Sequence, residues 1–375
     1  MIIGILKEPQ EENRVSLLPE QAEGLIKNGN QVWLEKGAGE KAFALDEAYL
    51  ACNVIIQERT KIIQEADILL SYWAIPEAIA GQIKEDAILI GVYQPLFQFN
   101  LMKQWAQQKL TCFSLDMIPR TTRAQSMDVL SSQANIAGYK AVLFAANLFP
   151  RYFPMFMTAA GSIAPAKLLV LGAGVAGLQA VATAKRLGAV VEVSDTRPAV
   201  KEEVMSLGAK FIEIEGAADA SAAGGYAVEQ SAEFKQKQQE RLAQSVAKSD
   251  IIIATAQLQG KQAPLLISEA MLKTMKAGSV VIDLAAATGG NVFGVQNNAT
   301  IQLHGVTLVG NSQLPSTMPW DASKMYGKNL LNFLQLILNK EGKLQLNFED
   351  DLIKGCCITH NATVTNSRVA ELINT

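Results

Sequence analysis

Three glycines in the middle of the chain, Gly172, Gly174 and Gly177, have the spacing G-x-G-x-x-G that is typical of dinucleotide binding. An apolar strand is expected at residues 168–171, directly before them, and an Ala-rich helix directly after them. The first glycine permits a tight turn, the second lets the backbone approach a pyrophosphate, and the third lets helix and strand pack closely. The phosphates then lie at a helix N-terminus, which favours negative charge. The sequence therefore predicts a dinucleotide site, with a glycine turn that only packs as the alternative.

An acidic residue indicates which dinucleotide is bound. Asp195 stands 18 positions after the last glycine (195 minus 177), at the end of a second expected strand over residues 190–193. A carboxylate there accepts hydrogen bonds from a free ribose 2′-OH and repels a 2′-phosphate. Arg197 could attract a phosphate or remain a solvated arginine that stacks on the adenine. Because the acid occupies the position that the motif assigns to the ribose, we predict NAD(H) rather than NADP(H) as the cofactor.

Other parts of the second half are expected to line the same site. Two apolar runs at residues 251–254 and 280–284 are typical of buried parallel strands. Both end in small residues, which leave room for a nicotinamide ring at the carboxyl ends of the strands. Further residues expected at the nucleotide are Val175, Ala176, Thr196, Thr255, Ala256 and Gln257.

A low-complexity segment, GAADASAAGGYA, occupies residues 216–227 and is expected to be a mobile surface loop. It is interpreted either as an insertion without a role or as a lid that closes over the bound nucleotide with its glycines as hinges. In the second interpretation Gly225 and Tyr226 contact the nucleotide. The sequence alone favours neither interpretation over the other.

The composition argues against several classes of partner. The 375 residues carry a net charge of −3, and 18% of them are charged, so no basic field indicates nucleic acid or an anionic membrane. The N-terminus lacks a signal-peptide pattern, and no apolar run approaches the roughly 20 residues that span a bilayer. The four cysteines form no C-x-x-C pair, and with only His304 and His360 present we expect no metal site. These features predict a soluble, cytoplasmic chain with free thiols.

The length suggests two domains. Strand-like and helix-like runs alternate through the first part, which predicts a parallel sheet with helices on both faces but no phosphate-binding glycines. We expect an α/β fold of two Rossmann-like, doubly wound parallel-sheet domains separated by a cleft. The first comprises residues 1–130 completed by 322–375, and the NAD(H)-binding domain comprises residues 131–321. A helix at 134–148 is long enough to bridge them, and residues 158–165 are expected to be a loop.

A polar stretch at residues 119–133, PRTTRAQSMDVLSSQ, suits binding of a carboxamide and a ribose better than proton transfer. Oxidation of an alcohol or amine needs a positioned acid or base, usually His or Lys, and the chain offers few candidates beyond Lys7 and Arg14 near its N-terminus. Hydride exchange between two nicotinamides requires only that the reacting carbons approach to about 3–3.5 Å. The sequence therefore favours such an exchange. The binding residues expected in the stretch are Arg120, Thr121, Thr122, Arg123, Gln125, Asp128 and Ser131.

Over nearly its whole length the chain resembles the alanine dehydrogenase/transhydrogenase family, and within it the NAD(H)-binding components (domain I, the first portion of the alpha subunit) of proton-translocating NAD(P) transhydrogenases. The likeness is carried by GILKEPQEENRVSLLP, RTTRAQSMDVLSSQANIAGYKAV, AAGSIAPAKLLVLGAGVAGLQA, MLKTMKAGSVVIDLAAATGGN and KNLLNFL. The second of these is the most diagnostic, because the family's loop places an Arg, a Gln and an Asp around the nicotinamide end of NAD. Arg120, Gln125 and Asp128 match them, with Ser131 alongside.

The resemblance implies a subunit that binds NAD(H) and exchanges a hydride with the NADP(H)-binding domain of a beta subunit. Membrane-spanning subunits would couple this exchange to proton translocation. It also implies a homodimer that is held at the cytoplasmic face of the inner membrane through its partners, and no nucleic acid. One departure lies at residues 314–323, LPSTMPWDAS, where the family often has V-P-S/R-x-A-x-D-A-S.

The sister enzyme alanine dehydrogenase is the first alternative. Arg14 matches its substrate-carboxylate arginine. Its lysine in K-V-K-E-P and its histidine in Y-L-H-L-A correspond here to SYWAIPE (71–77) and VYQPL (92–96), where an aromatic or small residue and Gln94 stand. Without these groups, amino-acid oxidation lacks its acid/base pair. The second alternative is a non-enzymatic NAD-sensing module, which the polar cluster argues against.

Overall fold

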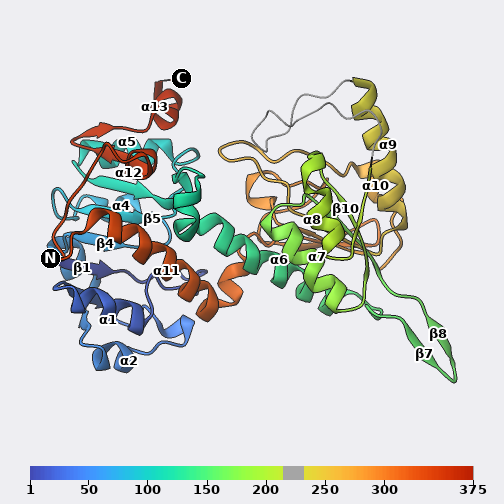
Figure 1. Cartoon of the computed structure of the whole chain (residues 1–375), viewed down its shortest axis with the longest axis horizontal. Helices are drawn as coiled ribbons and strands as arrows, with labels where there is room; N and C mark the ends of the chain where they lie inside the picture. Colours follow the sequence, from blue (N-terminus) through green and yellow to red (C-terminus); the bar gives the residue numbers. More distant parts are fainter. Residues whose placement is uncertain (214–231, 375) are drawn as a thin grey trace. The chain divides into compact units, whose positions relative to one another are not determined.

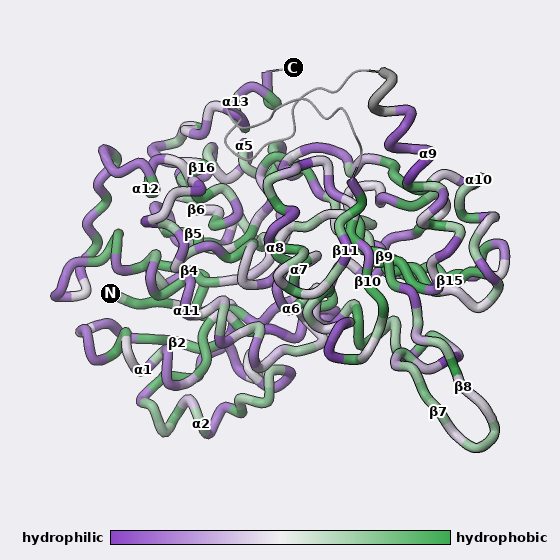
Figure 2. Tube along the Cα trace, turned by 45° about the vertical axis from the view of Figure 1, so that its right-hand side comes forward, coloured by the Kyte–Doolittle hydropathy of each residue, from purple (hydrophilic) through white to green (hydrophobic). Residues whose placement is uncertain are grey.

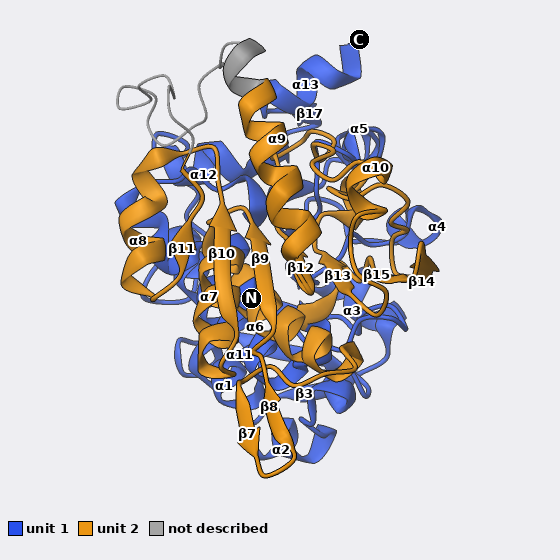
Figure 3. Ribbon diagram, turned by 90° about the vertical axis from the view of Figure 1, so that its right-hand side faces the viewer, with its two compact units in different colours: residues 1–133, 316–375 blue, residues 134–315 orange. Residues whose placement is uncertain are grey.

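The chain forms two compact units in a computed structural model that describes residues 1–213 and 232–374. Unit 1 comprises Met1–Gln133 and Ser316–Thr375, and unit 2 comprises Ala134–Pro315 (Figure 3). Each unit has its own hydrophobic core around one main sheet in which parallel pairing dominates. The predicted fold class is therefore confirmed.

Unit 1 is built on an eight-stranded sheet in the order β17-β16-β6-β5-β4-β1-β2-β3. The strands from β6 to β3 run parallel, whereas β16 pairs with β6 antiparallel, so the C-terminal segment completes one edge. The parallel strands are nearly continuous apolar runs, as expected for a sheet that is covered on both faces. The strands are β1 (Ile2–Ile5), β2 (Gln31–Glu35), β3 (Ile55–Gln57), β4 (Ile68–Leu70), β5 (Ile88–Gly91), β6 (Thr111–Ser114), β16 (Cys357–His360) and β17 (Thr363–Val364).

Helices connect these strands (Figure 1). In α1 (Pro19–Lys27) the local sequence explains why a helix forms. Pro19 stands in its first turn, where proline costs no hydrogen bond, and Ala22 and Leu25 are buried on one face. α11 (Pro319–Ile337) is the long amphipathic helix with which the chain re-enters unit 1, and it buries residues along its whole length. The other helices of unit 1 are α2 (Asp46–Ala51), α3 (Arg59–Glu65), α4 (Glu77–Ala80), α5 (Phe99–Gln107), α12 (Asp351–Cys356) and α13 (Ser367–Asn374).

The described residues of unit 2 form a seven-stranded sheet in the order β11-β10-β9-β12-β13-β15-β14. The chain runs outward from β9 to β11 and then returns to β12 on the other side of β9. This reversal is a topological switch point, where open α/β sheets bind ligands beyond the carboxyl ends of the strands. The strands are β9 (Lys167–Leu171), β10 (Val190–Ser194), β11 (Lys210–Phe211), β12 (Ile251–Ala254), β13 (Val280–Asp283), β14 (Thr300–Leu303) and β15 (Val306–Val309).

The helices of unit 2 pack on a strongly apolar sheet. Figure 2 shows hydrophobic residues concentrated in central strands such as β9 and hydrophilic residues along α9. No helix within residues 1–213 and 232–374 is both long enough and apolar enough to cross a bilayer. The helices are α6 (Val129–Leu148), α7 (Val175–Arg186), α8 (Lys201–Ser206), α9 (Ala232–Lys248) and α10 (Glu269–Leu272).

Two segments of unit 2 differ from the sequence-based expectations. Residues 158–165, expected to be a loop, instead contribute to a hairpin of β7 (Phe156–Thr158) and β8 (Gly161–Ile163). All residues of both strands are exposed, so they lack the alternation of buried and exposed residues that marks a half-buried strand. The sheet also contains β14, a strand that the sequence analysis does not predict, and it pairs antiparallel with β15 at the edge of the sheet.

Candidate functional site

The turn after β9 needs its first glycine for both conformation and space. Gly172 has a φ of +96°, and a Cβ at this position would lie 2.7 Å from Thr255 Oγ1. Thr255 directly follows β12, and its hydroxyl lies 3.0 Å from both Leu171 O and Gly172 O. The glycine turn and the end of β12 are therefore joined at the topological switch point.

The other two glycines have opposite surroundings. A Cβ on Gly174 would meet no heavy atom within 4 Å, so the backbone there is open to an incoming group. A Cβ on Gly177 would lie 1.8 Å from Gly172 O, so only glycine lets α7 pack on the turn. Val175 and Ala176 open α7, where backbone N–H groups have no acceptor within the helix. The turn can thus present N–H groups and the positive end of the helix dipole to a pyrophosphate.

Asp195 directly follows β10, and its carboxylate is fully engaged. Oδ2 accepts hydrogen bonds from the Ala173 N–H (2.7 Å) and from Arg197 Nη2 (2.9 Å), and Oδ1 accepts from the Arg197 backbone N–H (2.8 Å) and Nε (3.0 Å). Burial alone would raise the pKa of Asp195, but these bonds lower it. A carboxylate has about four lone-pair positions, so ribose hydroxyls can bind here only when the Arg197 side chain moves. Thr196, between them, is exposed.

The loop after β12 is fixed by a buried asparagine. Asn291 Oδ1 accepts the Ala256 N–H at 3.0 Å, and Gln257 Nε2 donates to Leu284 O at 2.6 Å. Asp283, the last residue of β13, accepts the Asn291 N–H at 2.6 Å. The sequence predicts Ala256 and Gln257 at this edge, but Asn291 and Asp283 were missed. An acid that ends an apolar strand is the sequence signal that could have found Asp283.

In unit 1 the polar stretch leads into α6 through a helix cap. Asp128 Oδ1 accepts the Ser131 backbone N–H at 2.9 Å, and Asp128 Oδ2 accepts the Ser131 hydroxyl at 2.6 Å. Aspartate before a helix satisfies one of the unpaired N–H groups of its first turn. The structure thus brings together two residues expected at the nicotinamide, and it gives both a role in starting α6.

The rest of the stretch forms the 3₁₀ helix η3 (Thr122–Met127), which is attached to α11 through its backbone. Asn329 and Asn332 donate side-chain hydrogen bonds to Ser126 O at 2.8 and 2.9 Å. The exposed Arg123 pairs with Asp350 at 2.5 and 2.9 Å and also with Asp351. The attachment leaves several predicted side chains accessible. These are Arg120, Thr121, Thr122 and Gln125.

Arg14, which the sequence left available for a ligand, is sealed in a buried ion pair. Its side chain is 3% exposed. Nε and Nη2 donate to Glu12 at 2.8 and 2.6 Å, and Nη1 donates to Gln133 Oε1 at 2.8 Å. The guanidinium lies 3.5 Å from the centroid of the Tyr72 ring, and Trp73 Nε1 donates to Glu12 at 2.8 Å. Burial would raise the pKa of Glu12, but Arg14 lowers it to about 2. Both partners are therefore charged, and the arginine is satisfied within the chain.

Other candidate acids and bases also interact with groups of the chain itself. Glu8 is buried and accepts the N–H groups of Tyr72 (2.5 Å) and Trp73 (3.2 Å), and burial raises its pKa to about 8 against the effect of these bonds. Burial likewise raises the pKa of Asp116 to about 6. Both histidines lie beside partners, His304 at 3.0 Å from Glu269 and His360 at 3.0 Å from Thr111.

Gly225 and Tyr226, the candidate lid residues, lie outside the described residues. Within the described residues, no group of three or more His, Cys, Asp or Glu side chains could hold a metal ion.

The strand order of unit 2, its glycine turn and the acid after β10 define a Rossmann-type nucleotide-binding domain. The sequence matches the family described as alanine dehydrogenase/PNT, N-terminal domain, over residues 4–137 and its C-terminal domain over residues 141–367. The chain therefore belongs to the alanine dehydrogenase/PNT family of oxidoreductases, and the predicted family is confirmed.

Relatives within this family differ clearly in their similarity to the chain. A Rickettsia prowazekii protein, named as the first portion of NAD(P) transhydrogenase subunit alpha, is 42% identical over 99% of this chain and 97% of its own length. The crystal structure of transhydrogenase from Sinorhizobium meliloti superposes with a TM-score of 0.89 at 40% identity, over 97% of this chain and all (100%) of that one. An alanine dehydrogenase from Methanococcus maripaludis is 24% identical over 99% of this chain and 96% of its own length.

Proposed function

We propose that this chain is the NAD(H)-binding component of a proton-translocating NAD(P) transhydrogenase. It binds NAD(H) at the glycine turn of unit 2 and exchanges a hydride with NADP(H) on a partner subunit. The similarity to transhydrogenase alpha subunits supports this proposal. The observation that carries the choice of reaction is the sealed Glu12–Arg14 pair. The resemblance gives alanine dehydrogenase an arginine for its substrate carboxylate, and here an internal carboxylate already occupies that arginine.

For this exchange the protein needs only to position the two nicotinamide rings. A hydrogen nucleus moves with two electrons from C4 of NADH to C4 of NADP⁺, which gives NAD⁺ and NADPH and releases no proton. We assign Arg120, Gln125, Asp128 and Ser131 to orienting the nicotinamide and its ribose. The other residues assigned to NAD(H) are Thr121, Thr122, Arg123, Gly172, Gly174, Val175, Ala176, Gly177, Asp195, Thr196, Arg197, Thr255, Ala256 and Gln257.

The partners follow from the same assignment. The NADP(H)-binding domain of a beta subunit holds the second nucleotide, and membrane-spanning subunits couple the exchange to proton translocation. The chain is a homodimer at the cytoplasmic face of the inner membrane, attached through these partners. The names of its relatives, which call the corresponding chain one portion of an alpha subunit, support the presence of further subunits.

A reconstitution assay tests the reaction. Mixed with the NADP(H)-binding domain of a transhydrogenase, the chain is expected to catalyse reduction of thio-NAD⁺ by NADPH, followed by the absorbance of the reduced analogue. Neither protein alone should do so, because each supplies one nucleotide. Turnover of alanine, or of pyruvate with ammonia, should be absent. Appreciable alanine turnover would favour the dehydrogenase alternative, and tight NADH binding without exchange would favour a sensing module.

A calorimetric titration tests the nucleotide choice. The wild type is expected to bind NADH much more tightly than NADPH. Asp195→Asn should weaken NADH binding about tenfold or more, because hydrogen bonds to a charged group contribute about 1.5–3 kcal/mol. Arg197→Met should tighten NADH binding a few-fold, because Arg197 competes for the same carboxylate. Equal wild-type affinities for the two nucleotides would refute the role given to Asp195.

A further inference from the structure

One buried side chain of unit 2 holds both ends of the loop at residues 256–264, which lies just after β12. The amide of Asn291 pairs with both backbone groups of Ala256, because Oδ1 accepts the N–H at 3.0 Å and Nδ2 donates to the carbonyl oxygen at 2.9 Å. Nδ2 also donates to Pro264 O at 2.9 Å. A primary amide has two donor hydrogens, so both are used. The Asn291 amide thus joins the start of the loop to its end.

The backbone of Asn291 is fixed as well. Its N–H donates to Asp283 Oδ2 at 2.6 Å, and its carbonyl oxygen accepts the N–H groups of Leu266 and Ile267 at 2.8 and 2.9 Å. Asp283 ends β13, and its Oδ2 also accepts the Val292 N–H at 3.0 Å. Asn291 and Asp283 are both fully buried. Asn291 is therefore anchored to the end of a central strand, and the loop is anchored to Asn291.

The loop between these anchors is largely exposed. Its buried member, Ala263, donates its N–H to Thr288 O at 2.8 Å. An exposed segment makes few apolar contacts, so its position depends on the hydrogen bonds that hold it. Loss of the Asn291 amide would therefore loosen the start of the loop, next to β12. The exposed side chains of the loop are Gln257, Leu258, Gln259, Lys261 and Gln262.

The strand order places this loop on one particular side of the glycine turn. The turn follows β9, Asp195 follows β10 on one side of it, and the loop follows β12 on the other side. A dinucleotide with its pyrophosphate at the turn and its adenine ribose at Asp195 extends its nicotinamide half toward β12 and β13. The loop that Asn291 holds is therefore on the nicotinamide side of the site.

We propose that Asn291, held by Asp283, is a positioning residue that sets the 256–264 loop against the nicotinamide half of the bound nucleotide. Because Asn291 is fully buried, it acts through Ala256 and Gln257 rather than by touching the nucleotide. The inference rests on the proposed function, since it requires NAD(H) at this edge of the sheet. It means that the two halves of the nucleotide respond differently when Asn291 is changed.

Calorimetric titration with NADH and with ADP, which lacks the nicotinamide and its ribose, tests this difference. Asn291→Ala should weaken NADH binding about tenfold or more, because three hydrogen bonds that fix the loop are lost, and should change ADP affinity by no more than about twofold. Asn291→Asp keeps the size and one acceptor but loses both donors, so it should act in the same direction. Asp195→Asn should instead weaken both ligands. Equal losses for NADH and ADP in the Asn291 variants, or unchanged NADH affinity, would overturn the proposal.

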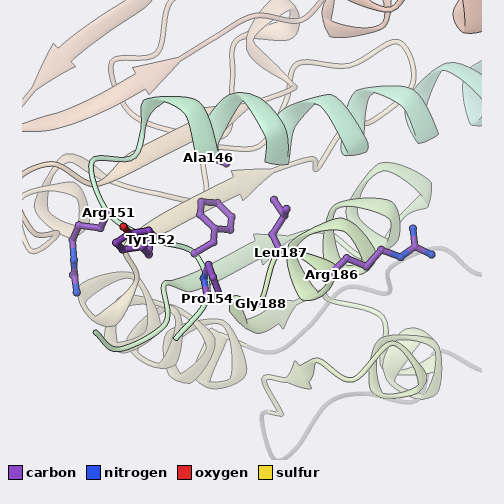
Figure 4. A pocket seen from close by; sticks show the side chains of 8 residues that line it. Ala146, Arg151, Tyr152, Pro154, Arg186, Leu187 and Gly188 are labelled. Carbon is purple, nitrogen blue, oxygen red and sulfur yellow. The ribbon is translucent and has the colours of Figure 1, made fainter. Parts of the chain in front are cut away.

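A matched control removes a buried polar side chain at the opposite edge of the same sheet. Asp250 directly precedes β12, is 4% exposed and accepts the Lys167 N–H at 2.9 Å. Arg151, 3.8 Å from Asp250, lines the pocket of about 510 Å³ in Figure 4, so that pocket is also near the amino ends of the strands. Asp250→Ala should lower the melting temperature yet change NADH affinity by no more than about twofold, because distant sites act independently. A loss of NADH affinity as large as in Asn291→Ala would reduce the effect to general destabilisation and overturn the proposal.

A double-mutant cycle tests the part played by Asp283. Asp283→Asn keeps the volume but replaces one acceptor oxygen by an NH₂ group. If Asp283 acts through Asn291, the double variant should bind NADH within about twofold of Asn291→Ala alone, whereas independent effects would multiply. Multiplied losses would overturn the route through Asp283.

The fluorescence of the reduced nicotinamide at saturating NADH reports the surroundings of the ring directly. It should move toward that of free NADH in Asn291→Ala and keep its wild-type value in Asp250→Ala. Wild-type fluorescence in Asn291→Ala would overturn the proposal. A wild type that binds no NADH marks failure of the proposed function, whereas a wild type that binds NADH, with variants that miss the expected pattern, marks failure of this inference.

Discussion

Replacement of Glu12 by alanine is expected to lower the free energy of unfolding of unit 1 by about 3–5 kcal/mol. The variant leaves the guanidinium of Arg14 in the interior without the carboxylate that binds it at 2.6 and 2.8 Å. Its remaining partners, Gln133 Oε1 and the Tyr72 ring, are neutral and cannot balance the charge. The cost is large because the orphaned cation stays desolvated.

Denaturant unfolding followed by tryptophan fluorescence measures this loss, because all four tryptophans belong to unit 1: Trp33, Trp73, Trp105 and Trp320. Glu40→Ala, which removes an exposed carboxylate 4.0 Å from Lys7, is the control and should change stability by no more than about 0.5 kcal/mol. The folded-state pKa of Glu12 is about 2, below its ordinary value of 4.5. Its stabilisation is therefore present above pH 4.5 and lost as the pH falls toward 2. A neutral-pH loss below about 1 kcal/mol would contradict the account.

Gly177→Ala is expected to reduce NADH affinity by more than about 100-fold, or about 2.7 kcal/mol. The added Cβ would lie 1.8 Å from Gly172 O, so α7 must move away from the turn. This movement displaces the N–H groups that are proposed to bind the pyrophosphate. Quenching or enhancement of NADH fluorescence during titration measures the affinity. Wild-type affinity in this variant would place the nucleotide elsewhere.

Gly174→Ala separates packing from ligand approach. Its Cβ would meet no heavy atom within 4 Å and the residue has a φ of −80°, so the free protein should keep its melting temperature. Only the incoming nucleotide meets the new methyl group, and NADH should bind about tenfold more weakly, or about 1.4 kcal/mol. Gly24→Ala, another position with no heavy atom within 4 Å, controls for the substitution itself. Unchanged NADH affinity in Gly174→Ala would mean that no phosphate passes over this backbone.

The features of unit 2 that could be predicted from the sequence depend on short-range order. The strand, the glycine turn and α7 follow one another within residues 167–186, and each has its own residue pattern. The bonds between Asp195 and Arg197 are also local, but they depend on the side-chain conformation of Arg197, which no sequence pattern specifies. The sequence could therefore predict where the acid lies but not that its lone pairs are occupied.

The features that escaped prediction depend on distant residues or lack a burial pattern. Arg14 meets Gln133 across 119 positions of the chain, so only the folded unit shows that the guanidinium is satisfied. The hairpin of β7 and β8 buries none of its strand residues, and so no periodicity of buried side chains marks it. Asp128 and Ser131 were interpreted as ligand chemistry alone, although the same residue types also start helices.

The sealed Glu12–Arg14 pair also restricts how this chain can diverge. Loss of either residue alone leaves the other's charge in the interior, at a cost that is a large share of the 5–15 kcal/mol that stabilises an ordinary domain. An ancestor or descendant that uses this arginine for an external carboxylate must therefore change both the acid and its surroundings, including Trp73. Single steps between the two states are therefore expected to pass through strongly destabilised proteins. The pair thus acts as an epistatic barrier, and we expect the two residues to be gained and lost together among relatives.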